Sequence, residues 1–123
     1  MPQSIAIIGA GPSGLAASRA LAKAGLSYVG FESADGVGGL WNIDNPRSTM
    51  YESAHLISSR TTTEFRELPM TTAADYPSHR ELRKYFQAYS DRYDLGENFR
   101  FSTTVDRVEP ADGGGWNVTS VRE

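Results

Sequence analysis

The fold of this chain is decided by residues 5–14, which read IAIIGAGPSG. The apolar, β-branched start of this stretch is typical of a buried parallel strand, and the glycines after it predict a sharp turn into a helix. Gly9 permits the tight turn because it has no Cβ, and Gly14 lets the helix lie close to the strand. We expect the helix at residues 13–24, with Gly25 as its stop.

An acidic residue completes the pattern. A second strand is predicted at residues 27–31, and Glu32 follows it directly. In such a unit Gly11 lets a pyrophosphate approach the backbone, the helix N-terminus attracts it, and the acid accepts hydrogen bonds from ribose hydroxyls. Glu32 would also repel a 2′-phosphate in the same low-dielectric pocket. The pattern therefore predicts a site for FAD or NAD, not NADP. A turn that only packs a helix onto a sheet would leave Glu32 unexplained.

The second half of the chain predicts one more helix, a third strand and a hairpin. Residues 78–81 (SHRE) have the capping-box pattern, and Gly96 is expected to end the segment that follows. One face of that helix carries a stripe of large apolar side chains at helical spacing: Leu82, Tyr85, Phe86, Tyr89 and Tyr93. A short strand is expected at residues 99–101, and antiparallel strands at 105–109 and 116–121. Short strands or turns are expected near residues 51–60.

These elements predict an α/β fold, an incomplete Rossmann-like FAD/NAD(P)-binding domain. Its parallel β-α-β core should have strand order 3-2-1, with a C-terminal β-hairpin or meander in place of a further crossover helix. The 123 residues suffice for one small domain.

Composition excludes several classes of function. The net charge of −3 and the lack of a basic stripe argue against a nucleic-acid partner. Without cysteine there are no disulfides, thiolate nucleophiles or cysteine metal sites. No apolar stretch approaches about 18 residues, and no charged leader precedes the first strand, so we expect a cytoplasmic protein with no membrane span. No Ser-His-Asp set, carboxylate pair or metal-ligand spacing stands out, and the catalytic residues are unknown.

A second glycine pair and the blocks after it resemble the flavin-containing monooxygenase family. The blocks are GGLW at 38–41, MYES at 50–53, EFRELPM at 64–70, YPSHREL at 76–82, FRFSTTV at 99–105 and WNV at 116–118. Their order and spacing resemble the N-terminal quarter of the family over nearly the whole chain. The resemblance implies FAD as the cofactor of this first site.

The resemblance also implies a role for individual residues. It places Gly9, Gly11, Pro12, Ser13 and Gly14 at the FAD pyrophosphate, Glu32 at the adenosine ribose, Gly39, Leu40 and Trp41 along the diphosphate and ribityl chain, and the Val105 backbone at the adenine. In this family NADPH reduces the flavin, and one oxygen atom from O2 then passes to a small-molecule nucleophile such as an amine, a sulfide or a ketone. The expected function is therefore the FAD-binding N-terminal part of an NADPH-dependent flavin monooxygenase.

Two departures from the family pattern qualify this expectation. Ile57 stands where the family has an Asn near the flavin, which puts the oxygenation step in doubt more than flavin binding; His55 or Ser58 are candidate substitutes. A second GxGxxG for NADPH and a C-terminal segment over the flavin ring are absent. Residues 1–123 are thus expected to form a partial domain, with the NADPH site mostly outside it. Alone, it should be inactive, bind FAD weakly or not at all, and self-associate through uncovered edges.

Other interpretations stay open. A different two-dinucleotide flavoenzyme, such as an amine oxidase or a disulfide reductase, shares the same first half, although the lack of cysteine argues against the reductase. A non-catalytic nucleotide-binding module is the alternative outside enzymes. Among single residues, His79 is expected to be solvated or to support the helix cap, Trp116 to pack the hairpin, and Arg60 and Arg80 to be surface charges.

Overall fold

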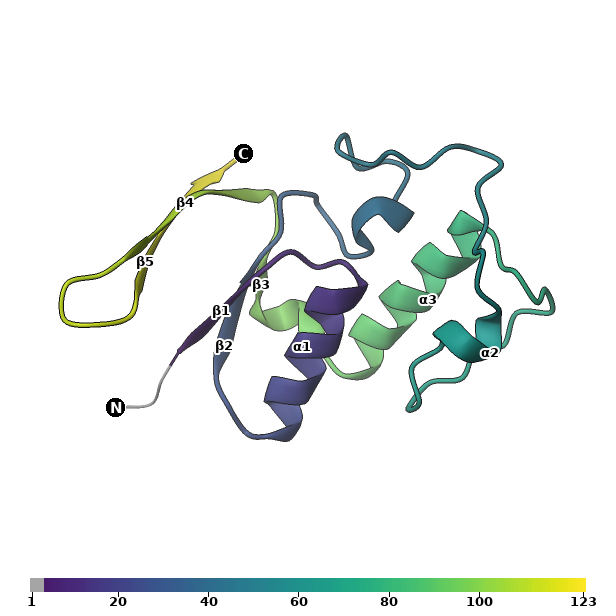
Figure 1. Ribbon diagram of the computed structural model, residues 1–123, viewed down its shortest axis with the longest axis horizontal. Helices are drawn as coiled ribbons and strands as arrows, with labels where there is room; N and C mark the ends of the chain where they lie inside the picture. The colour runs from purple at the N-terminus through teal and green to yellow at the C-terminus, as the bar shows by residue number, and fades with distance from the viewer. Residues whose placement is uncertain (1–3) are drawn as a thin grey trace.

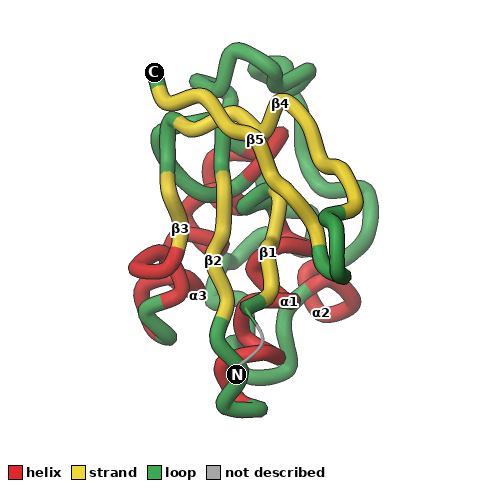
Figure 2. The backbone as a smooth tube through the Cα atoms, turned by 90° about the vertical axis from the view of Figure 1, so that its left-hand side faces the viewer, coloured by secondary structure: helices red, strands yellow, loops and turns green. Residues whose placement is uncertain are grey.

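The computed structural model describes residues 4–123 and has the predicted α/β fold (Figure 1). Its sheet contains β1 (Ile5–Ile8), β2 (Tyr28–Phe31) and β3 (Phe99–Arg100), all parallel, in the spatial order 3-2-1. The strands lie in front of the helices in Figure 2, so the long helices cover one face of the sheet. The predicted strand order and the parallel pairing are confirmed.

The first β-α-β unit is built as the glycine pattern predicts. The helix α1 spans Pro12–Lys23, with proline in its first turn and Gly11 as its N-cap. At the other end Gly25 takes a left-handed φ of 70°, and the amides after the helix donate back to the carbonyls of Ala22 and Leu21. These two hydrogen bonds close the helix in a Schellman motif, which explains why a glycine stops it.

The second long helix, α3 (His79–Arg92), begins with the predicted capping box. The Ser78 hydroxyl accepts a hydrogen bond from the Glu81 amide, and the Glu81 carboxylate accepts one from the Ser78 amide. The apolar stripe faces the core, where Leu82, Phe86 and Tyr89 are at most 3% exposed. The prediction for the end of this segment was wrong: α3 stops at Arg92, and Gly96 lies inside the 3-10 helix η2 (Leu95–Asn98).

A left-handed residue explains that early end. Asp94, between the two helices, has a φ of 53°, which a continuing α-helix does not allow. The break turns Leu95 into the core, where it is fully buried and its carbonyl accepts a hydrogen bond from the Tyr28 hydroxyl. Burial of Leu95 therefore decides the boundary, and no glycine is needed at that point.

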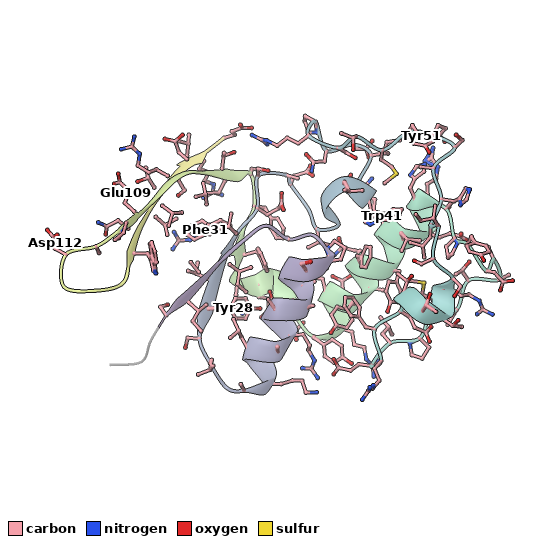
Figure 3. The ribbon with its side chains drawn as sticks, in the orientation of Figure 1. Tyr28, Phe31, Trp41, Tyr51, Glu109 and Asp112 are labelled. Atoms are coloured by element: carbon pink, nitrogen blue, oxygen red, sulfur yellow. The ribbon has the colours of Figure 1, made fainter. Side chains whose placement is uncertain are left out.

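A hairpin of β4 (Thr103–Pro110) and β5 (Trp116–Arg122) projects from the end of the sheet, as Figure 1 shows. Three glycines with positive φ form its tip. The side chains of Glu109 and Asp112 lie on this projection, away from the helices (Figure 3). Trp116 is 68% exposed, so the expectation that it packs the hairpin was wrong. It pairs with Pro110 next to the tip, where no described element covers it.

Residues 33–77 form a long connection that contains two short helices, η1 (Gly39–Trp41) and α2 (Arg60–Thr63). The second was not expected, because a single turn of threonines has weak helix propensity. The Arg60 amide, which donates to the carbonyl of Asp75 at 2.8 Å, fixes this turn. Between residues 51 and 60 the chain forms turns and one isolated bridge, from His55 to Ser78.

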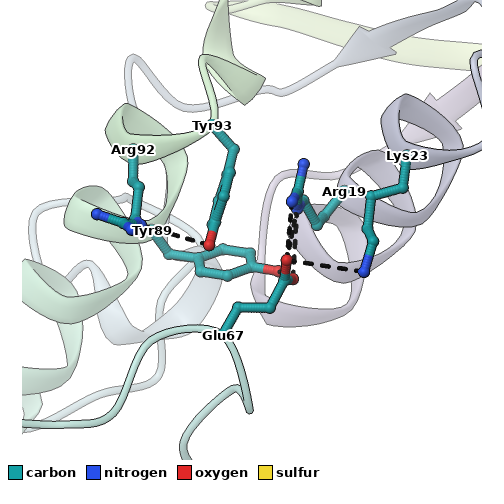
Figure 4. A network of polar contacts seen from close by, with 6 residues as sticks. All are labelled: Arg19, Lys23, Glu67, Tyr89, Arg92 and Tyr93. Atoms are coloured by element: carbon teal, nitrogen blue, oxygen red, sulfur yellow. Dashed lines mark hydrogen bonds and ion pairs between the residues drawn. The ribbon is translucent and has the colours of Figure 1, made fainter.

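A polar cluster joins this connection to both long helices (Figure 4). The Glu67 carboxylate accepts hydrogen bonds from the Arg19 guanidinium at 2.8 and 3.0 Å and from the Tyr89 hydroxyl at 3.2 Å. Lys23 adds a longer ion pair, 3.8 Å away. The hydrogen bond from Arg19 lowers the pKa of Glu67 below its usual 4.5. Burial, and then the neighbouring carboxylate, raise the pKa of Tyr89 to about 12.

Replacing Glu67 with Gln should lower stability at neutral pH and flatten its dependence on acid. A carboxyl with a lowered folded pKa stabilises the protein above its unfolded value of 4.5, and this contribution is lost as the pH falls through the folded pKa. Urea unfolding at about pH 7 and pH 3 measures both effects. Glu97→Gln, which changes an exposed carboxylate, serves as the control. Equal acid dependence in Glu67→Gln and the parent chain would argue against the cluster.

Candidate nucleotide site

The glycine turn after β1 has the geometry that its sequence predicts. Gly9 takes a φ of 103°, a region that side chains with a Cβ rarely adopt. Its amide donates to the carbonyl of Phe31 at 2.8 Å, which ties the turn to the end of β2. A Cβ on Gly14 would lie 2.0 Å from the Gly9 carbonyl oxygen. The close approach of helix to strand therefore requires glycine at position 14.

The two glycine clusters, distant in the sequence, touch each other in the fold. The Gly38 amide donates to the carbonyl of Ala10 at 3.0 Å. A Cβ on Gly39 would lie 3.0 Å from the Cα of Gly11, and Gly39 itself has a φ of 58°. The N-terminus of η1 therefore lies against the N-terminus of α1. Amides in the first turn of a helix have no intrahelical acceptor, which suits this corner to an anionic ligand.

Glu32 lies beside this corner, at the end of β2, and is only 6% exposed. One oxygen accepts a hydrogen bond from the Ala10 amide at 2.8 Å, and the other accepts one from the Ala34 amide at 2.7 Å. The Ser33 hydroxyl is a third donor, at 3.3 Å. A carboxylate offers about four acceptor positions, so Glu32 keeps capacity for a further hydroxyl donor.

A cleft of about 230 Å³ opens at the carboxyl ends of β1 and β2. Its lining consists of Ile8, Gly9, Phe31, Glu32, Ser33, Arg47, Thr103, Thr104 and Val105. Open α/β sheets bind ligands at this end of their strands. The cleft brings together Glu32 and Val105, which the sequence resemblance had assigned to one nucleotide.

Six of the lining residues were not predicted as site residues, among them Ile8 and Phe31, which end β1 and β2. Thr103 and Thr104 precede Val105 directly and could have been included as neighbours on the same strand. Ser33 follows Glu32 in the same way. Arg47 comes from the loop after η1, in a segment that carries no motif, and only the folded chain places it at the cleft.

A larger hollow, of about 350 Å³, lies elsewhere, between the segment 68–72 and α3. Its walls are mostly apolar, including Leu68, Met70 and Tyr85. None of the glycines of either cluster lines it. We assign the nucleotide site to the smaller cleft because strand ends, Glu32 and the glycine turn converge there.

Several predicted residues lie away from the cleft. Leu40 is 49% exposed, while Trp41 is partly buried and points toward α3 (Figure 3). His55 is exposed, with its Nδ1 2.9 Å from the carbonyl oxygen of Leu56, and Ile57 is 90% exposed. Ser58 pairs with the Thr63 hydroxyl at 2.6 Å. None of these five residues lines the cleft around Glu32.

His79 is a correction to the sequence analysis. It is 1% exposed, so the first of the two expectations, a solvated residue, was wrong, and its support of the helix cap stays a prediction. Its Nε2 lies 3.1 Å from the carbonyl oxygen of Glu52, and its amide donates to Ala54 at 3.2 Å. These contacts attach the start of α3 to the preceding connection. Arg80, by contrast, is exposed and pairs with Glu52, as a surface charge should.

Residues 4–123 contain no helix that is long and apolar enough to cross a membrane. They also contain no group of three or more His, Cys, Asp or Glu side chains that could hold a metal ion.

Comparison with known proteins gives one consistent result. The family model described as "FMO-like: Flavin-binding monooxygenase-like" matches residues 2–123. Flavin-containing monooxygenase FMO GS-OX3 from Arabidopsis thaliana is 37% identical over 94% of this chain and 30% of its own length. Dimethylaniline monooxygenase [N-oxide-forming] 2 from Oryctolagus cuniculus is 31% identical over 98% of this chain and 24% of its own.

The solved structures that resemble this chain are also monooxygenases. The open crystal structure of cyclohexanone monooxygenase matches with a TM-score of 0.82 and 31% identity, over 95% of this chain and 23% of that one. Oxidized steroid monooxygenase bound to NADP matches with a TM-score of 0.84 and 27% identity, over 96% and 23%. The chain thus spans less than a third of each of these four proteins.

Proposed function

This chain belongs to the flavin-binding monooxygenase-like family, and we propose that it supplies the N-terminal, adenosine-binding part of the FAD site of an NADPH-dependent monooxygenase. The observation that carries the proposal is the convergence of Glu32 and both glycine clusters at the carboxyl ends of β1 and β2. The site fits the cofactor: a Cβ on Gly39 would lie only 3.0 Å from the Cα of Gly11, and the Glu32 carboxylate keeps acceptor capacity.

Each element of the site has a distinct task in this proposal. The N-termini of α1 and η1, including the amides of Ser13 and Gly14, bind the pyrophosphate; Pro12, which has no amide hydrogen, presets the first turn. Glu32 accepts hydrogen bonds from the ribose. The Val105 backbone contacts the adenine, and Leu40 and Trp41 line the path toward the ribityl chain. When bound, FAD supplies the redox chemistry, and the protein orients it.

The substrate class follows the family. The names of relatives include an N-oxide-forming dimethylaniline monooxygenase and a cyclohexanone monooxygenase. We propose that the complete site transfers one oxygen atom from O2 to a soft small-molecule nucleophile of this kind, with NADPH as the reductant. Residues 1–123 hold one partial FAD-binding domain in this scheme, and most of the NADPH site lies outside them.

The 123-residue chain should bind ADP, and it should bind FAD weakly, no more tightly than ADP. The adenosine half of the site is built from the described residues, whereas the flavin ring would find little contact surface here. Isothermal titration with ADP, FAD and riboflavin measures this, and riboflavin should show no binding. The chain should also consume no oxygen with NADPH. A chain that purifies yellow with stoichiometric flavin, or that turns over NADPH, would contradict this part of the proposal.

We further propose that the isolated chain self-associates through the free edge of β1. This strand pairs only with β2 in the described sheet, and Ile8 at its end is 57% exposed. An uncharged apolar edge strand is a template for pairing with another chain. Sedimentation over a concentration series should detect the association, and Ala6→Lys on β1 should weaken it. Ala17→Lys, on the exposed face of α1, is the matched control; equal association in both variants argues against the edge.

A further inference from the structure

One cation reaches the cleft from a segment that the family pattern does not assign. Arg47 lies on the loop after η1, and its guanidinium donates to the Thr104 hydroxyl at 3.5 Å. The loop beneath it is fixed: the Asn45 side chain accepts a hydrogen bond from the Arg47 amide at 3.1 Å, and the Asn45 carbonyl accepts one from Ser48 at 2.8 Å. Asn45 itself is only 9% exposed. Arg47 is thus an exposed side chain on an anchored backbone.

The cleft that Arg47 lines is the nucleoside end of the site. Its walls include Glu32, for the ribose, and Val105, for the adenine, but neither Gly11 nor Gly39 of the pyrophosphate corner. The partner of Arg47, Thr104, is the direct neighbour of Val105. The guanidinium therefore lies near the base rather than near the phosphates.

The chemistry of the lining points the same way. Phe31 is 7% exposed, so it offers little ring surface to a ligand. Arg47 supplies the other planar group among the lining residues, and it is exposed. Guanidinium planes stack on nucleobases and other aromatic faces. The bond to Thr104 is long, so little is lost when the guanidinium turns onto a ligand.

We propose that Arg47 stacks on the exposed face of the adenine and holds the base against Val105, as a positioning residue of the nucleotide. This inference rests on the proposed function, because it takes the cleft to be an adenosine site. It assigns the guanidinium to the base, and neither to the diphosphate nor to a 2′-phosphate. The contact closes the nucleoside end of the site from the side opposite the sheet.

Binding of ADP to the full 123-residue chain, followed by isothermal titration, tests the assignment. Arg47→Ala should weaken ADP binding about 5- to 30-fold, the range for a guanidinium on a largely desolvated ring face. Arg47→Lys keeps the charge but loses the plane, so its affinity should stay within about threefold of that of Arg47→Ala. Arg107→Ala removes the same charge from an exposed position on β4 outside the cleft, and should bind ADP like the parent chain.

The titrations with these variants can overturn the stacking assignment, the proposed function, or both. Unchanged affinity in Arg47→Ala, full recovery in Arg47→Lys, or an equal loss in Arg107→Ala overturns the stacking assignment. So does a loss that disappears between about 50 and 500 mM NaCl, because a phosphate contact is screened and a stacked contact is not. A parent chain that does not bind ADP overturns the proposed function as well. If the parent chain binds ADP, and Glu32→Ala abolishes this binding while Arg47→Ala leaves it unchanged, this inference alone is overturned.

Discussion

Gly14→Ala should destabilise the chain by about 3 kcal/mol or more, a large part of the stability of a small domain. The added Cβ would lie 2.0 Å from the carbonyl oxygen of Gly9 and 2.9 Å from its carbonyl carbon. Both are backbone atoms, so no side-chain rotation relieves the clash and α1 must move away from β1. Urea unfolding followed by circular dichroism measures the loss.

Gly36→Ala is the matched control for this substitution. A Cβ at position 36 would meet nothing within 4 Å, and the residue has no left-handed φ. We expect a change within about 0.5 kcal/mol. If Gly14→Ala were as mild as Gly36→Ala, the close helix–strand approach on which the site depends would be wrong.

Glu32→Ala should lower both stability and nucleotide affinity. The carboxylate accepts hydrogen bonds from the amides of Ala10 and Ala34, and Ala10 is fully buried. Removing it leaves two backbone donors unpaired, each at a cost of about 1–3 kcal/mol. The same change removes the acceptor for the ribose, so ADP binding should fall at least about tenfold. Urea unfolding and ADP titration separate the two effects.

Glu52→Ala controls for the loss of a carboxylate in general. Glu52 is exposed, and among the described residues its carboxylate pairs only with the Arg80 side chain. Such pairs contribute little, so its stability and ADP affinity should match those of the parent chain. A Glu32→Ala variant that unfolds at the same urea concentration as Glu52→Ala would mean that the Glu32 carboxylate does not hold the two strand ends together.

Sequence patterns predicted the local features because the chemistry that causes them is local. The glycine turn, the capping box of Ser78 and Glu81, and the stop at Gly25 depend on neighbours within a few residues. Strand order also followed, because a right-handed crossover leaves few choices for a short parallel sheet.

The features that were missed depend on contacts between distant segments. Nothing near Arg47 in the sequence indicates that its loop crosses to β4. His79 is buried because residues 52–54 cover it. Trp116 is exposed because no described residue covers its side chain. The helix α3 ends at Arg92 instead of the predicted Gly96 because Leu95 enters the core. Local propensity cannot supply such contacts.

The contact between Gly11 and Gly39 joins distant segments, yet the sequence resemblance partly anticipated it. The sequence resemblance assigned both residues to one cofactor, and the fold brings their backbones together. The agreement comes from two independent observations, a motif and a backbone distance. It supports the view that the corner is shaped for a diphosphate.

The most direct test of the central claim is a titration of the ¹⁵N-labelled chain with ADP, observed by NMR. If residues 9–14, 32, 38–39 and 105 form one nucleotide site, the amide signals of all of them except Pro12 should shift together with a single dissociation constant. The signals of the hollow between residues 68–72 and α3 should not move. Shifts confined to that groove, or none at all with ADP in millimolar excess, would contradict the account.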